Sequence, residues 1–214
     1  AEMDLVNSLV ATAHASLRQG RTDDANALST EALTAARAIA QNPPALASRY
    51  LLSRAIGARS WTLYRLGRRD EYEKITIEGI ALDESIARDD PTNWHARSNI
   101  ATGRCDLADL YDDQGRYEES LRQEERALDI YSGLHASDPR NSEHILSLSI
   151  QHRRHSKALL QLSRPSEAEI SARASVDLAR GLVRDDDTNA AAWEALRRAL
   201  LDAALLAEVY LAMT

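Results

Sequence analysis

The densest group of side chains that could carry chemistry is the run His152-Arg153-Arg154-His155. Two histidines three residues apart on a helix lie on one face, where they can share a metal ion. The two adjacent arginines would repel a bound cation, and the repeat register described below turns both histidines toward neighbouring helices. We therefore predict that these histidines pack inside the protein and hold no metal.

Two other candidates also favour a structural interpretation. The stretch 185–187 with Asn189 resembles the start of a calcium-binding loop, but Ala190 and Leu196 stand where such a loop needs a glycine and a bidentate glutamate. Helix capping in a solvated turn is the prediction instead. Cys105 is the single cysteine, so it excludes an internal disulfide, and we expect it to be a small buried residue rather than a nucleophile.

Recognisable enzyme motifs are absent from the sequence. The glycines are isolated, whereas a phosphate-binding loop needs consecutive backbone N–H groups that point toward one site. The sequence contains neither a Gly-x-Ser-x-Gly elbow nor a His-Glu-x-x-His zinc helix. We predict no catalytic residue, no metal and no cofactor, and a chain that is not an enzyme by itself.

Composition indicates which elements would position these side chains. The 214 residues are rich in Ala, Leu, Arg and Glu, lack Phe, and include only 8 Gly and 5 Pro, which favours an all-α chain. The net charge of −7 argues against nucleic acid as a partner. No apolar run is long enough to span a membrane, and no signal peptide is recognisable. We expect a soluble bacterial protein, cytoplasmic, or periplasmic if the chain is a fragment of a membrane-anchored protein.

The turn residues reveal an internal repeat. Gly20, Gly67 and Gly115 are 47 and 48 residues apart, and three prolines follow the same spacing. Another 48 residues lead to Ser163. Glycine after a helix and Asp-Pro before the next one are typical of helix ends. The spacing predicts helices at 3–19, 22–41, 44–66, 69–89, 92–114, 117–136, 140–162, 166–184 and 189–212.

Small residues recur at two places in each repeat, where they would let antiparallel helices approach closely. They stand seven residues before and twelve residues after the turn residue, and an aliphatic side chain follows the second place in each of four repeats. The nine small residues are Ala13, Ser60, Ala108, Ser156, Ala204, Ala32, Gly79, Ala127 and Ser175.

The third repeat resembles the tetratricopeptide repeat (TPR) through Leu107-Ala108, Tyr111, Gly115, Tyr117, Ser120, Ala127-Leu128 and Pro139. The resemblance implies a right-handed α-solenoid of four antiparallel helix pairs plus a terminal helix. We predict a single domain, 1–214, with repeats at 1–43, 44–90, 91–138 and 139–187 and a terminal helix at 188–214. The family repeat has 34 residues, so each helix here is about seven residues, or two turns, longer. Such long repeats are similar to modules of bacterial signalling proteins, including eukaryotic-like Ser/Thr kinases.

The resemblance also implies that the first helix of each pair lines a concave groove. Carried over by register, the candidate groove residues are Asn7, His14, Arg54, Trp61, Tyr64, Asp109, Asp112, Arg153 and Lys157. Two alternatives remain open: the aromatic residues are core, and Asp109 pairs with Arg153. The two-carboxylate clamp for chaperone C-termini is disfavoured, because Val10, His14, Gly57 and Trp61 stand where it needs Lys and Asn.

The terminal helix has a second apolar stripe, Leu201, Leu205 and Val209, which predicts contact with another copy of the chain or with a continuation of it. The leading functional hypothesis is a scaffold that binds a protein or peptide in its groove. The alternative is a regulatory or sensor domain of a larger signalling protein such as a Ser/Thr kinase. An uncharacterised enzyme ranks third, because the fold alone does not exclude it.

Overall fold

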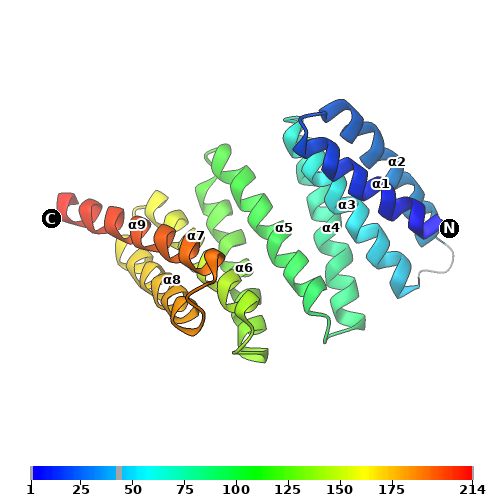
Figure 1. Ribbon diagram of the computed structural model, residues 1–214. Coiled ribbons are helices and arrows are strands. Elements are labelled where there is room, and N and C mark those ends of the chain that lie inside the picture. Colours follow the sequence, from blue (N-terminus) through cyan, green and yellow to red (C-terminus); the bar gives the residue numbers. More distant parts are fainter. Residues whose placement is uncertain (1, 42–44, 214) are drawn as a thin grey trace. The chain divides into compact units, whose positions relative to one another are not determined.

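The computed structural model describes residues 2–41 and 45–213, with side chains as far as residue 205. This part of the chain is all-helical, as composition and periodicity predict (Figure 1). Every helix begins and ends within two residues of its predicted range. The helices are α1 (Glu2–Arg18), α2 (Thr22–Ala40), α3 (Leu46–Arg65), α4 (Arg69–Asp89), α5 (Trp94–Asp113), α6 (Tyr117–Ser137), α7 (Ser142–Gln161), α8 (Pro165–Asp185) and α9 (Ala190–Met213).

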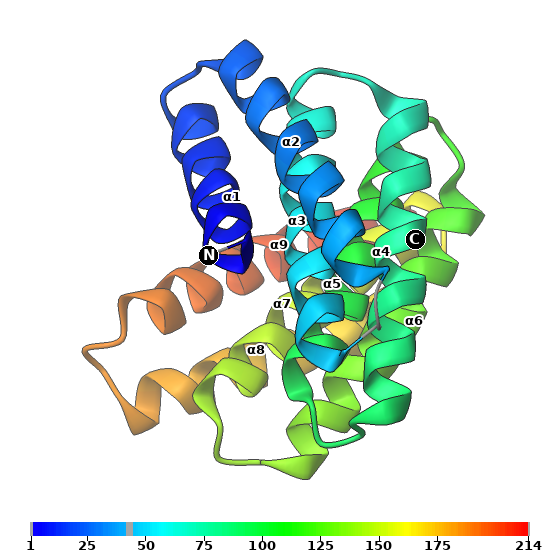
Figure 2. The ribbon, with the colours of Figure 1, turned by 90° about the vertical axis from the view of Figure 1, so that its right-hand side faces the viewer.

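Two compact units divide the chain within α5, at Gly103 and Arg104. In the first unit α1 packs against α2, α2 against α3 and α3 against α4, while α1 also contacts α3. The second unit repeats this arrangement: α6, α7, α8 and α9 pack in sequence, and α7 also contacts α9. In each unit, consecutive helices run antiparallel and are joined by short loops (Figure 2).

The turn inside each helix pair has the backbone conformation that the repeat predicts. Gly20, Gly67 and Gly115 have φ of +75°, +69° and +71°, and Ser163, at the place predicted for the fourth turn, has φ of +56°. In all four turns the next residue, always an arginine, donates its N–H to the carbonyl five positions earlier, which closes the preceding helix. Glycine adopts positive φ without strain, whereas serine does so only at a cost in free energy.

Asparagine caps α5, α7 and the terminal helix α9. Asn93, Asn141 and Asn189 accept hydrogen bonds from backbone N–H groups two or three residues ahead, at 3.0–3.2 Å. Thr188 donates to the Asp186 carboxylate in the same stretch. The interpretation of residues 185–189 as a helix cap and solvated turn is confirmed.

Small side chains lie in the seams between paired helices, as predicted. Eight of the nine are buried, and Ala204 is exposed. A Cβ atom on Gly79 would lie 2.9 Å from Cγ2 of Ile56, so α3 and α4 approach too closely there for a larger residue. Ser60 hydrogen-bonds to Thr76 across the same pair of helices, at 2.8 Å.

Candidate functional site

In the first unit, α3 exposes two of the predicted groove residues side by side. Trp61 and Tyr64 are each 48% exposed, and their rings stack with centroids 5.7 Å apart. Tyr64 also contacts the ring of Tyr72, which α4 buries, with centroids 5.5 Å apart. The alternative that these two aromatic residues are core is therefore wrong. The sequence analysis did not name Tyr72 as part of this group. The only feature that could have indicated it is its position near the start of the second helix, five residues after the turn glycine.

Polar candidates lie on α1 and α3 of the same unit. Arg54 Nη1 donates to Asn7 Oδ1 at 2.7 Å, which links the two helices. His14 is half-buried, and its pKa is lowered by burial first and then by the positive charges of Arg18 and Arg54. Its imidazole is therefore neutral at pH 7. We name the group Trp61, Tyr64 and Arg54 the aromatic surface.

In the second unit, Arg153 and Lys157 lie one turn apart on α7. Arg153 Nη1 lies 3.1 Å from Asp202 Oδ2 of α9, the single ion pair of this arginine among the described residues. Lys157 is exposed and has no polar partner in the same part of the chain. Their role as ligand-binding groove residues stays a prediction.

Asp109 contacts a different arginine from the one considered in the sequence. Its carboxylate accepts from Arg154 at 2.9 Å, and Arg154 also donates to the buried Glu124 at 2.7 Å. The pairing of Asp109 with Arg153 is therefore wrong, because Arg153 turns toward Asp202 instead. Asp112, the other acidic candidate, is half-buried. Arg154 was visible in the sequence only as the neighbour of Arg153.

Cys105 on α5 and the pair His152 and His155 on α7 are partly buried. Burial raises the pKa of the Cys105 thiol to about 12, and its Sγ lies 3.1 Å from Gln151 Oε1. The thiol is therefore protonated at neutral pH and is a poor nucleophile. His152 and His155 are half-buried, and His155 Nδ1 hydrogen-bonds to Ser171 of α8 at 2.8 Å. Their predicted packing against neighbouring helices agrees with these contacts.

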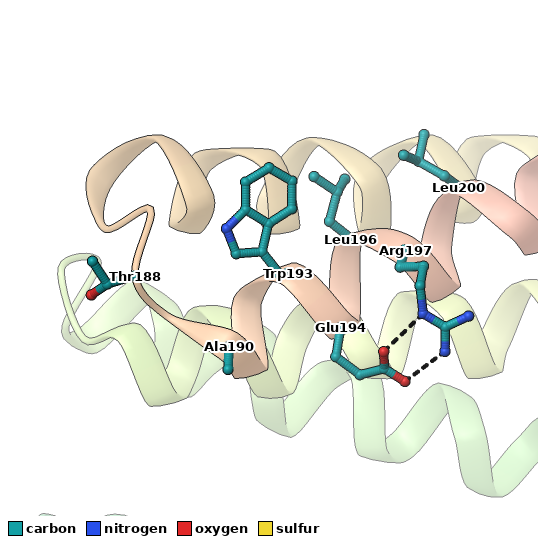
Figure 3. Close-up of a pocket in the computed structure, with 7 residues that line it drawn as sticks. All are labelled: Thr188, Ala190, Trp193, Glu194, Leu196, Arg197 and Leu200. Atoms are coloured by element: carbon teal, nitrogen blue, oxygen red, sulfur yellow. Dashed lines mark hydrogen bonds and ion pairs between the residues drawn. The ribbon is translucent and has the colours of Figure 1, made fainter.

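The terminal helix α9 carries an apolar hollow of about 660 Å³ (Figure 3). The close-up shows Trp193, Leu196 and Leu200 along one side of the helix, with the ion pair of Glu194 and Arg197 beside them. The residues that line the hollow are Thr188, Ala190, Trp193, Glu194, Leu196, Arg197 and Leu200.

Of the predicted contact stripe on α9, Leu201 and Leu205 are 54% and 52% exposed. The side chain of Val209 lies outside the described residues.

Among residues 2–41 and 45–205, no three His, Cys, Asp or Glu side chains are grouped so that they could hold a metal ion. In the part of the chain that the structure describes, no helix combines the length and the apolar character that crossing a membrane requires.

The helix pairs, turn conformations and buried small residues define a TPR-like helical repeat fold of the α-solenoid class. BtubC (BKLC) from P. vanneervenii is similar in structure, with a TM-score of 0.62 and 14% identity over 99% of this chain and 82% of that one. A putative kinesin light chain with TPR-like repeats from Podosopora anserina has a TM-score of 0.57 and 18% identity, over 94% and 96% of the two chains.

The apo form of RapI is a further structural neighbour, with a TM-score of 0.53 and 10% identity over 93% of this chain and 52% of RapI. At these identities the likeness shows the fold alone. No protein-family model and no curated protein matches the sequence.

Proposed function

We propose that this chain is a non-catalytic scaffold module that binds a peptide segment of another protein on the aromatic surface. The observation that carries the proposal is the stacked pair Trp61 and Tyr64, large rings that are each half-exposed on the first helix of a repeat. Tryptophan, tyrosine and arginine dominate the energetic hot spots of protein interfaces. The aromatic surface contains one of each.

Two structural features favour tight binding at this surface. Tyr72 holds Tyr64, and Tyr64 holds Trp61, so the rings lose little conformational freedom when a ligand covers them. Gly57, between Arg54 and Trp61 along α3, has open space where a side chain would stand. A peptide backbone could therefore approach the helix closely between the cation and the rings.

The test begins with a random 12-residue peptide library selected on the wild-type protein. Selected peptides are then titrated against a Trp61→Ala/Tyr64→Ala variant by fluorescence anisotropy. Loss of two hot-spot rings should weaken binding at least 10-fold, because a single hot spot contributes about 2 kcal/mol or more.

The matched control is Ile77→Ala, on α4 of the same unit, which removes an apolar side chain that is also 48% exposed. It should bind the selected peptides as the wild type does. Equal affinity of the double variant and the wild type would show that the aromatic surface is not the binding site. A library that yields no binder would contradict the module function as a whole.

The other predictions are proposals of the same kind. We interpret the repeat as an elongated TPR unit, and the exposed Leu201 and Leu205 as a contact for a second copy of the chain. Analytical sedimentation at high protein concentration tests the dimer. A protein that stays monomeric there would exclude it. A regulatory or sensor role within a larger signalling protein, and a cytoplasmic location, stay predictions.

A further inference from the structure

A second cavity, of about 230 Å³, lies in the second unit between α7 and α9. Most of its lining residues come from α7 and α9, and α8 contributes Ser175. The lining residues are Leu146, Ser149, Ile150, Arg153, Ser175, Ala191, Glu194, Ala195 and Arg198. We name it the α7–α9 cavity.

Part of the lining of the α7–α9 cavity is apolar. Leu146, Ile150 and Ala195 present aliphatic carbon, and Ile150 is 39% exposed. The Ser149 hydroxyl already has a hydrogen-bond acceptor, since it donates to the Ser175 carbonyl at 2.9 Å. A ligand therefore finds no unpaired serine donor there, and burial of an aliphatic side chain would stabilise the complex.

The rim of the cavity is cationic. Arg153 donates one hydrogen bond, to the Asp202 carboxylate. Arg198 donates one hydrogen bond from its Nε, to Glu194, at 2.6 Å. Glu194 also accepts two hydrogen bonds from Arg197 (Figure 3). The hydrogen bonds from Arg197 and Arg198 together lower the pKa of the Glu194 carboxyl to about 2. The lining itself contains two arginines, Arg153 and Arg198, and one carboxylate, Glu194, so it carries one positive charge in excess.

Lys157 adds a further cation one turn along α7, with no partner in the described part of the chain. The whole chain, in contrast, carries a net charge of −7. An excess of positive charge beside an apolar cavity is therefore a local feature of this face rather than a property of the protein surface in general.

We propose that the α7–α9 cavity binds an aliphatic side chain of an acidic peptide segment, with Arg153 and Arg198 donating to Asp or Glu carboxylates on either side of it. The proposal rests on the protein-binding function above and specifies the chemistry of the partner. Guanidinium groups with unused N–H donors match carboxylates in geometry and charge. The volume suits one side chain, because pockets for drug-sized ligands span about 300–1,000 Å³.

The test uses ten-residue peptides with acetylated N-termini and amidated C-termini, so that the carboxylates come from side chains alone. Each has Leu, Ile, Val or Met at the centre, Glu on both sides, and Gly and Ser elsewhere. ¹⁵N-HSQC titration of the full chain detects weak binding and locates it. Saturable shifts should appear at Ile150 and Ala195, and peptides with Gln in place of Glu, or Ala at the centre, should bind at least 10-fold more weakly.

Two variants address the two halves of the cavity separately. Arg153→Gln/Arg198→Gln removes the rim cations, and Ala191→Leu, at an exposed lining position, fills part of the cavity. Each should weaken binding at least 10-fold. Arg173→Gln is the matched control, because it removes a 76% exposed arginine of α8 that does not line the cavity.

The outcomes separate this proposal from the function on which it rests. Equal binding of the Glu and Gln peptides, unchanged affinity in Ala191→Leu, or no saturable shift with any acidic peptide would overturn the proposal. The aromatic surface would still be tested by its own selected peptides. If the peptide library also yields no binder, the protein-binding function itself is wrong.

Discussion

The guanidinium of Arg154, on α7, lies against the carboxylate of Glu124, on α6, with Nη2 and Oε1 2.7 Å apart. Glu124 is only 4% exposed, and burial raises the pKa of its carboxyl even though Arg154 opposes the shift. Arg154 also donates to the carbonyl of Cys105 on α5, at 3.0 Å. One side chain therefore joins three helices of the second unit.

The first prediction concerns this buried charge pair. Arg154→Ala should lower the free energy of unfolding by about 3–5 kcal/mol, because it leaves the Glu124 carboxylate buried without its cation. Adding Glu124→Gln should recover part of the loss, since the amide carries no charge. Urea denaturation at pH 7 measures both variants. A loss below about 1 kcal/mol for Arg154→Ala would mean that the charge is solvated in a way the structure does not show.

The second prediction concerns the fourth turn, where a serine has positive φ. Ser163→Gly should raise the free energy of unfolding by about 0.5–1 kcal/mol. Glycine relieves a strain of about 1–2 kcal/mol that serine has at positive φ in the folded state. Part of this gain is lost, because glycine also gives the unfolded chain more conformational entropy. Gly115→Ala, the reverse change at the equivalent turn, should destabilise the protein by about 1 kcal/mol. Thermal and urea unfolding would show the opposite signs; equal signs would contradict the account of the turns.

The third prediction separates two glycines by the space beside them. Gly79→Ala should destabilise the protein by about 1–3 kcal/mol, because the new methyl group would overlap Ile56. Gly57→Ala, inside α3 with open space around it, should stabilise the protein by about 0.5–1 kcal/mol through helix propensity. Denaturant midpoints decide, and stabilisation by both substitutions would show that α3 and α4 are not closely packed.

The fourth prediction concerns pH. Asp83, on α4, is 5% exposed, and burial raises the pKa of its carboxyl to about 6, against smaller opposing effects of hydrogen bonds from Ser53 and Asn99. Between pH 4 and 6 the folded state therefore binds this proton more tightly than the unfolded state, so ionisation of Asp83 lowers stability as pH rises through 6.

Asp83→Asn removes that ionisation and can keep the hydrogen bond from Ser53, which is 2.7 Å long. The variant should be more stable than the wild type by about 1–2 kcal/mol at pH 7.5, and this advantage should shrink at pH 4.5. Denaturation at the two pH values measures the difference in free energy of unfolding between the variant and the wild type. The contributions of the other titrating groups cancel in this difference. A variant that is less stable at pH 7.5 would show that the ionised carboxylate is well stabilised in the fold.

The helices, the turns and the seams between paired helices could be predicted from the residues alone. Each depends on a local property: Gly67 permits positive φ, and small residues such as Ala13 permit close approach wherever the fold brings them. Because such requirements recur with the repeat, even Ser163 could be assigned to a turn by spacing alone. The same register assigned Trp61 and Tyr64 to the first helix of a pair, but their exposure was established only by the structure.

The pairing of charged side chains, in contrast, depended on how the helices pack. Successive residues of a helix point about 100° apart, so Arg153 and Arg154 face different neighbours. Arg153 contacts Asp202 on α9, whereas Arg154 contacts Asp109 and Glu124 on α5 and α6. Long, flexible side chains select partners by the distances between helices, which depend on packing along the whole seam. A sequence pattern can assign a residue to a face, but the packed helices determine its partner.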